Sequence, residues 1–453
     1  MKRSLLLTCA LILGNVAHAQ EGVPDTSFGT LGSGRVVFGF DLPANGFDSP
    51  AGIVTDIQGR TYAVGVSADL NNTVWRATLA RLTANGALDN TFGIGGKVVS
   101  TALEGSFLAQ DLARDSLGQL LVAGSRVFGN ITQGDRDFLV CRFSLAGAAI
   151  DFAAPTSNHC RSVPFDLGGN NQDQASIIKT LPNGSMYLVG YAVDSANFAT
   201  AKIAVVKLTS TGALDTTFSG DGKLAISYPG GNATYIYDAD VGADGALYLS
   251  GEVDISGSLA VLAVKIGATG VLDTAFGGDG FQAYQLDLGA AGFRDDIGRA
   301  IALRNDGKLV IGGSAQTALD QVNGFVLRIS STNAGFDPSF GNAGRLILGS
   351  NVAIADVLAL ADGKTVYAAA LKSAGTTRFR IGRLGEGGHD LKFGLGGVSD
   401  ISFGLAQGLD FPRELALSGD RVVAMGVVYN SLSDSEFGIA RLTGDAIFAN
   451  GFE

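Results

Sequence analysis

The sequence is poor in the residues from which most catalytic centres are built. Of its 453 residues, 3 are histidine and 3 are cysteine. His18 lies near the N-terminus. The other two, His159 and His389, lie far apart in the sequence. The chain has no His-Glu-x-x-His motif, no Gly-x-Ser-x-Gly turn and no phosphate-binding loop. We therefore predict no catalytic residue, no bound metal and no cofactor.

Basic clusters and long apolar runs are also missing. The formal net charge is −11, and no run of Lys and Arg is present, which argues against nucleic acid and anionic membrane as partners. The apolar stretch Leu5–Leu13 is too short to span a bilayer, and no other stretch approaches the needed length. Lys2 and Arg3 precede this stretch and Ala17-His18-Ala19 follows it, which is the pattern of a secretory signal. We expect residues 1–19 to be a signal peptide and the protein to be exported, that is, secreted, periplasmic or held at the cell surface.

Two cysteines remain beyond this leader, Cys141 and Cys160. An oxidising compartment after export permits a disulfide between them. The alternative is a pair of unbridged buried thiols on different strands. The sequence leaves both open.

What the chain does contain is a repeat, written Asp-x-x-Phe-Gly in its fullest form. Because each unit of such a repeat must bury its face against its neighbours, the repeat predicts the architecture of nearly the whole chain. Clear copies begin at Asp25, Asp89, Asp215, Asp273, Asp337 and Asp390, a worn copy at Asp151 and a truncated one at Asp445.

Each unit contains four short apolar runs with the length and composition of β-strands, and none shows a helical period. The second and third runs are separated by turns such as Asn183-Gly184, Asp244-Gly245 and Asp306-Gly307, which supply the positive φ angles of a two-residue hairpin. Every unit is therefore predicted to be a four-stranded antiparallel meander.

These units predict an all-β fold, a seven-bladed β-propeller of four-stranded antiparallel blades. Radial packing buries both faces of each blade and explains runs that are apolar throughout. We expect the propeller domain over residues 20–445 and a short C-terminal tail over 446–453. If the first strand joins the last repeat, the two ends of the chain complete one blade and close the ring. A linear solenoid is the alternative, but no capping unit is visible.

The segment Ala80-Arg-Leu-Thr-Ala-Asn-Gly-Ala-Leu-Asp-Asn-Thr-Phe-Gly93 resembles the delta-60 repeat family, and the resemblance extends over roughly residues 23 to 445. It implies an exported bacterial propeller-like protein and carries no catalytic motif to transfer. The unit that begins at Asp151 departs from the pattern, because it lacks the Phe-Gly pair.

Two sets of charged residues recur, and each has a structural and a functional interpretation. The repeated aspartates suggest calcium, but each unit offers too few acids for six to eight oxygen ligands, so we favour Asp as a turn cap. Cations that end the fourth runs either line a functional ring or pair with neighbouring carboxylates, and we favour pairing. A second recurring acid, at Asp48, Asp173 and Asp296, is interpreted as a turn or inter-blade acceptor.

In a meander, the connections after the first and third runs share one face, and here they differ in every unit. A face that varies between equal blades is the better candidate for recognition. Its strongest aromatic and charged content gives the predicted binding residues, Tyr228, Tyr235, Tyr237, Phe293, Arg294, Asp295 and Asp296.

Two functions follow from this sequence. The first is a non-catalytic binding or scaffold module, expected to be a monomer, that recognises an extracellular protein or glycan through the irregular face. The second is a hydrolase or lyase that acts on an extracellular polysaccharide through carboxylates in the central cleft. The lack of catalytic histidines favours the first. A cluster of Asp, Glu and Tyr at the channel mouth would favour the second.

Overall fold

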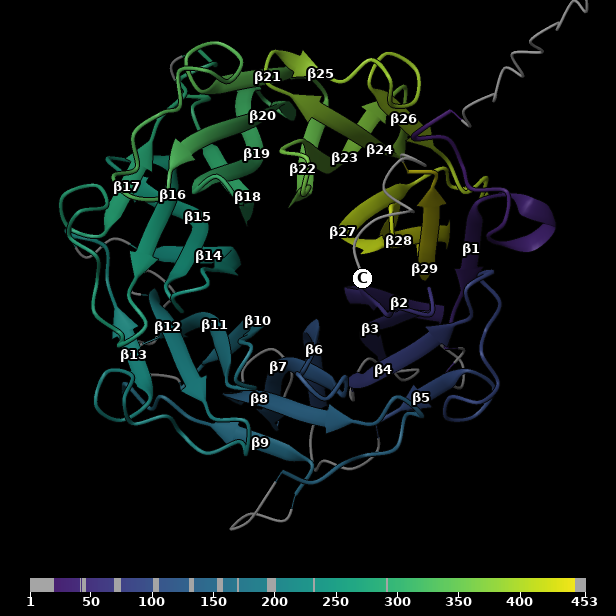
Figure 1. The fold of residues 1–453 in the computed structure, drawn as a ribbon, viewed down its shortest axis with the longest axis horizontal. Helices are drawn as coiled ribbons and strands as arrows, with labels where there is room; N and C mark the ends of the chain where they lie inside the picture. The colour runs from purple at the N-terminus through teal and green to yellow at the C-terminus, as the bar shows by residue number, and fades with distance from the viewer. Residues whose placement is uncertain are drawn as a thin grey trace, which may run out of the picture.

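The computed structural model describes residues 20–40, 42, 46–68, 75–100, 106–129, 134–152, 158–168, 171–193, 201–230, 233–290 and 292–444. These segments contain β-strands, turns and one short 3-10 turn, η1 (Thr30–Gly32), and no α-helix. Four-stranded antiparallel sheets stand side by side around a ring (Figure 1). No helix of the described segments has the length and apolar character that a membrane crossing requires. The predicted signal peptide and the predicted tail lie outside the described residues.

Four of the sheets have four strands each, in chain order. Their strands are β6 (Ser106–Arg114), β7 (Leu120–Phe128), β8 (Asp135–Phe143) and β9 (Cys160–Val163); β10 (Gln174–Thr180), β11 (Met186–Val193), β12 (Ala201–Leu208) and β13 (Lys223–Ile226); β14 (Thr234–Val241), β15 (Leu247–Ile255), β16 (Ser258–Ile266) and β17 (Phe281–Tyr284); and β18 (Asp296–Leu303), β19 (Lys308–Ala318), β20 (Gln321–Ser330) and β21 (Arg345–Ser350).

The other two sheets are larger. A five-stranded sheet holds β22 (Val352–Ala359), β23 (Thr365–Ser373), β24 (Thr376–Gly385), β25 (Gly388–His389) and β26 (Val398–Ile401). An eight-stranded sheet holds β27 (Asp410–Ser418), β28 (Arg421–Ser431), β29 (Asp434–Leu442), β2 (Gly46–Thr55), β3 (Thr61–Ala68), β4 (Trp75–Leu82), β5 (Lys97–Val99) and, on β29, β1 (Arg35–Phe38).

The order of strands within each sheet confirms the predicted antiparallel meander and settles its phase. Each sheet begins with the run before the hairpin and ends with the run that follows the next aspartate motif, as in β6-β7-β8-β9. The strands nearest the centre of the ring are β2, β6, β10, β14, β18, β22 and β27 (Figure 1). The predicted first strand of each unit is therefore the outermost strand of the preceding sheet.

Cores form between neighbouring sheets, which explains why the middle strands are apolar on both faces. Every residue of β3 is buried. One core cluster joins Val205 of β12 to Leu249 of β15, and Phe218 of a repeat motif is fully buried in it. Polar side chains on such strands would lose solvation on either face, so the alternation of a one-sided sheet is absent.

The repeated aspartate caps its turn and pairs with the cation that ends the fourth run. Asp89 Oδ1 accepts the backbone N–H of Thr91 at 3.0 Å, and Arg81 Nε lies 2.9 Å from Asp89 Oδ2. The guanidinium also lies over the ring of the buried Phe92. Equivalent pairs are Lys207–Asp215, Lys265–Asp273, Arg328–Asp337, Arg383–Asp390 and Arg441–Asp25. The structural interpretation of both residues is confirmed for these units.

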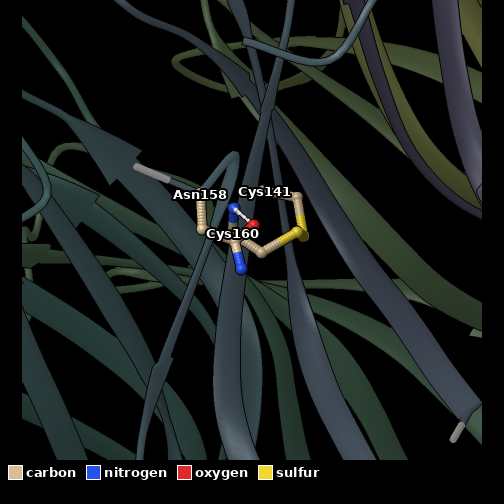
Figure 2. Close-up of a disulfide and its surroundings, with 3 residues drawn as sticks. All are labelled: Cys141, Asn158 and Cys160. Carbon is tan, nitrogen blue, oxygen red and sulfur yellow. Dashed lines mark hydrogen bonds between the residues drawn. A yellow bond between two sulfur atoms is a disulfide. The ribbon is translucent and has the colours of Figure 1, made fainter. Parts of the chain in front are cut away.

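The worn unit is the exception. Arg142 stacks over Phe152 at 4.2 Å, and its nearest acid is Asp115, at 3.8 Å. On the same sheet Cys141 of β8 and Cys160 of β9 are direct cross-strand neighbours and are joined by a disulfide (Figure 2). The side chain of Asn158 accepts the Cys160 N–H at 3.2 Å. A covalent link thus lies where the repeat motif is incomplete.

The ends of the described chain meet in one sheet, as predicted for ring closure. β1 pairs antiparallel with β29, and Val36 lies opposite Ile439. Upstream of β1, Asp25 Oδ2 accepts a hydrogen bond from Arg441 Nε at 2.8 Å. A strand from the start of the chain therefore completes the sheet made by its end.

Candidate functional site

One position on each innermost strand interrupts the pairing with the next strand. The register shifts there by one residue, so a single side chain is left over at a β-bulge. These neck residues line two adjoining cavities at the centre of the ring. They are Ala51, Gln110, Ser176, Tyr237, Arg299, Ala355 and Arg413.

The cavity on the hairpin side of the neck, here the turn-side chamber, has a volume of about 300 Å³. Its charged lining is dominated by carboxylates around one ammonium group, Lys179, whose Nζ lies 3.5 Å from Asp238 Oδ1. Burial disfavours the charged ammonium, but the carboxylates of Asp238 and Asp111 raise the pKa of Lys179. The acids that line the chamber are Asp111, Asp238, Asp240, Asp356 and Glu414.

Burial shifts these carboxyl groups away from their ordinary ionisation. It raises the pKa of Asp111 to about 6 and that of Asp356 to about 7. It also raises the pKa values of Asp238 and Glu414, and the neighbouring carboxylates raise that of Glu414 further. The cluster is thus partly protonated near neutral pH.

Each of these carboxyl groups also joins its sheet to the next one around the ring. Asp111 accepts the backbone N–H of Ile178 at 2.8 Å, and Asp238 accepts that of Ile301 at 2.8 Å. The same contact recurs from Asp356 to Leu415 at 2.7 Å and from Glu414 to Ile53 at 2.8 Å. These acids therefore hold the innermost strands together.

The cavity on the other side of the neck, here the loop-side chamber, is larger, at about 870 Å³. It lies along the N-terminal halves of the innermost strands, towards the irregular loops. Its aromatic lining residues are Tyr191, Tyr235, Tyr237, Phe411 and Tyr429. The rings of Tyr191 and Tyr235 lie 5.7 Å apart and those of Phe411 and Tyr429 lie 6.2 Å apart, both edge to face.

Two arginines stand at the neck between the chambers. The guanidinium of Arg299 stacks over the ring of Tyr237 at 4.0 Å. The side chain of Arg413 is accessible from the channel. Protein atoms surround it on its other sides. Burial lowers the pKa of Arg413, and the positive charge of Arg299 lowers it further.

The predicted binding residues fall into two groups. Tyr235 and Tyr237 lie on β14 and line the loop-side chamber. Tyr228 packs edge to face on Phe281 at 5.6 Å, away from the residues that line either chamber. The structure thus brings two of the predicted tyrosines to the channel and places the third in a core.

Of the remaining predicted residues, three belong to the connection between β17 and β18, and Asp296 is the first residue of β18. Phe293 is half-buried and its N–H donates to the carbonyl of Ala290 at 3.0 Å. Arg294 lies 3.6 Å from Asp287 in an exposed ion pair. The remaining two, Asp295 and Asp296, accept backbone N–H groups from Leu259 at 2.9 Å and from Leu286 at 2.6 Å. These four residues line neither chamber.

The buried Asp296 belongs to the second recurring set of acids, and its partners confirm the predicted acceptor role. Asp48 and Asp173 accept the backbone N–H groups of Phe40 at 2.7 Å and Phe165 at 2.8 Å. Burial raises the pKa of Asp173 and of Asp296 to about 6. These acids hold the connections that lead into β2, β10 and β18.

Apart from Tyr237, the neck residues were not predicted from the sequence, and neither was the acidic cluster. A signal was present, because Tyr237 precedes the hairpin glycine Gly245 by the same eight residues that separate Arg299 from Gly307. That offset gains meaning only when the run before the hairpin is known to be innermost.

Comparison with known proteins supports the fold. Residues 59–92 match a family model described as a domain of unknown function (DUF5122) beta-propeller. No curated protein sequence matches the chain. The match names a β-propeller, in agreement with four-stranded antiparallel sheets around a ring, and the described part of the chain has that all-β fold.

Solved structures with which the chain aligns include a propeller domain. The β-propeller domain of the Trilobed protease from Pyrococcus furiosus aligns with 90% of this chain and 99% of its own, at 9% identity and a TM-score of 0.41. A protein of unknown function from Dyadobacter fermentans aligns with 90% of this chain and 98% of its own, at 10% identity and a TM-score of 0.44. The polysaccharide lyase Uly1 aligns with 89% of this chain and 90% of its own, at 7% identity and a TM-score of 0.48.

Proposed function

We propose that this protein is an exported, non-catalytic binding module that takes an extracellular glycan or a segment of an extracellular protein into its loop-side chamber. The observation that carries the proposal is the chamber itself, about 870 Å³ in volume and lined by Tyr191, Tyr235, Tyr237 and Tyr429. Ligand sites of this size typically combine aromatic walls with a few polar groups.

The proposal includes the architecture and the location. The ring is a propeller of seven blades, because the eight-stranded sheet divides into two four-stranded blades whose strands pair with each other at only two positions, Gly46–Asp434 and Phe47–Ser435. Residues 1–19 direct export, 20–445 form the propeller and 446–453 form a tail. The repeats belong with the delta-60 pattern, and the protein acts as a monomer.

The acids of the turn-side chamber have a structural role. Asp111, Asp238, Asp356 and Glu414 each accept a backbone N–H from the neighbouring sheet. At least one oxygen of each carboxyl group thus holds the scaffold, and each group also lines the chamber, where a general acid or base would have to contact a substrate proton.

Tyrosine variants of the purified full-length product test the proposal. Binding is measured by calorimetry against cell-wall fragments and a panel of polysaccharides, with Tyr235→Ala and Tyr429→Ala compared to Tyr228→Phe, which keeps its core contact. We expect the alanine variants to lose about tenfold in affinity, since a buried aromatic anchor is typically worth over 1 kcal/mol. A ligand that binds all variants equally, or no ligand at all, would contradict a site in this chamber.

A second candidate, a hydrolase or lyase, is favoured by the cluster of Asp, Glu and Tyr residues that lines the turn-side chamber. Burial raises the pKa of Asp356 to about 7, which is the range of a general acid or base. The test is release of new chain ends from the same polysaccharides by the wild-type protein and by Asp356→Asn. Product that forms with the wild type and not with the variant would establish this candidate in place of the first.

A further inference from the structure

Arg299 and Arg413 hold equivalent bulge positions on β18 and β27, and both line both chambers. Each side chain is thus placed where a ligand in the loop-side chamber meets the neck. The two charges repel, as the effect of Arg299 on Arg413 shows. An anion between them would remove that repulsion.

Buried arginines elsewhere in this fold differ from the pair in their partners. Arg328, Arg383 and Arg441 each bind a carboxylate directly, at 2.6, 2.9 and 2.8 Å. Among the described residues, no carboxylate forms an ion pair with Arg299 or Arg413. Arg299 acts only from a distance on Glu252. A guanidinium in such a place is suited to bind a carboxylate with its two parallel N–H groups.

On the loop side of the neck, the groups around the pair are neutral and able to form hydrogen bonds, whereas the carboxylates of the turn-side chamber lie on the other side. Ser49, Gln110, Gln174 and Ser176 line the loop-side chamber together with the tyrosines. Hydroxyl and amide groups both donate and accept, which matches the many hydroxyls of a sugar. The flat tyrosine faces match the apolar faces of a sugar ring, and the chamber is of small-ligand size.

We propose that Arg299 and Arg413 bind the carboxylate of an acidic saccharide, a uronate unit whose ring lies among the tyrosines of the loop-side chamber. The inference rests on the proposed function, because that chamber supplies the site. An acidic peptide offers the same carboxylate, but the neutral hydroxyl and amide lining favours the saccharide. The peptide is therefore one outcome of the test.

The experiment measures binding of trimers of galacturonate, glucuronate and mannuronate, of a neutral galactose trimer and of triglutamate to the purified full-length product. Variants are Arg299→Gln, Arg413→Gln and Arg299→Lys. The matched control is Arg345→Gln, which removes the same charge from an exposed outer strand. Midpoints of thermal unfolding confirm that each variant is folded.

We expect at least one uronate trimer to bind in preference to the neutral trimer, and each Arg→Gln change to raise its dissociation constant about tenfold. Arg299→Lys should fall between, since it keeps the charge and loses the paired donors, while Arg345→Gln should change nothing. Added salt should weaken uronate binding.

Three results would overturn the inference. Equal binding of neutral and acidic trimers with no effect of the arginines would leave the proposed function standing and remove the carboxylate site. Arginine-dependent binding of triglutamate alone would replace the saccharide by a peptide. Binding of none of these probes, together with no binding in the polysaccharide panel, would remove the proposed function as well.

Discussion

A single backbone position decides what the centre of this ring presents. The neck residue sits at the same bulge on every innermost strand, yet it is Ala51 on β2, Tyr237 on β14 and Arg413 on β27. The backbone is repeated because the strands must pair and pack. The side chain at the bulge takes part in neither the pairing nor the packing of the strands, so it can differ from unit to unit. Recognition therefore arises from the differences between equivalent positions.

On β6, β14, β22 and β27 the residue after the bulge has a different role, because its carboxyl group holds neighbouring sheets together. Burial raises the pKa of Asp356 from 3.8 to about 7. A carboxyl whose pKa is raised in the folded state binds a proton that the unfolded chain has released. Its contribution to stability is present below about pH 4 and is lost as the pH rises to about 7.

Asp356→Asn should therefore flatten the pH dependence of unfolding. The amide keeps a carbonyl to accept the Leu415 N–H and never ionises. At pH 8 we expect the variant to be more stable than the wild type by on the order of 2 kcal/mol, and at pH 4.5 nearly equal to it. Urea unfolding at both values measures the difference.

Asp279→Asn is the matched control, because Asp279 is an exposed turn acid that accepts the Phe281 N–H. The difference in unfolding free energy between this variant and the wild type should be the same at pH 4.5 and at pH 8. If Asp356→Asn were instead less stable at pH 8 by the same amount as at pH 4.5, the ionised carboxylate would be needed as a partner of Lys179.

At the scale of elements, the repeat allowed the strands and turns to be predicted because they obey local rules. The Asp-Gly hairpins require positive φ, and the runs of Val, Leu and Tyr can be satisfied only between two apolar faces. Pairing of Arg81 with Asp89 followed from their recurrence in unit after unit. Each of these features depends only on residues that lie within about one repeat of the sequence.

The candidate site was harder to predict, because it is assembled from residues far apart in the chain. Tyr235 and Tyr237 were selected for their aromatic rings, and they do line the loop-side chamber. Lys179 and Arg413 attracted no notice, since a single charge in a strand has no local signature. Their role depends on which strand faces the centre, and that is fixed by the order of strands in the closed ring.

The outer strand β9 carries the prediction that belongs to this scale. Its disulfide to β8 spans 19 residues of sequence in the one unit whose repeat motif is worn. Cys141→Ser with Cys160→Ser should lower the free energy of unfolding by about 3 kcal/mol, because the unfolded chain regains the freedom of that loop. Denaturant unfolding of the variant gives the value.

Reduction of the wild type should give the same loss, with no further effect of reductant on the double variant. Equal unfolding curves for oxidised, reduced and double-variant proteins would contradict a stabilising role. In that case the packing of Phe152 and Val163 in the neighbouring core would be sufficient to hold β9.

At the scale of the molecule, closure of the ring makes its equivalent sheets unfold as one cooperative unit. Carboxyl groups on β6, β14, β22 and β27 link these innermost strands to the next ones, and the sheet that completes the ring takes β1 from one end of the chain and β27 to β29 from the other. Asp25 adds ion pairs to Arg421 at 2.9 Å and Arg441 at 2.8 Å. These contacts hold the two ends of the described chain together. They keep the ring from opening at its seam, the sheet in which β1 pairs with β29.

Removing β1 should therefore destabilise the whole ring and not only its last sheet. A chain that starts at Gly46 lacks the partner of β29 and exposes Phe437, which stacks on Phe38 at 5.2 Å in the intact protein. We expect its thermal unfolding midpoint to fall by more than about 5 °C in a single transition, since loss of several kcal/mol at the seam is shared by all sheets. Calorimetry compares it with a chain that starts at Gln20. A separate low-temperature transition, with the main one unmoved, would show instead that the sheets unfold independently and that the seam adds nothing to the remainder.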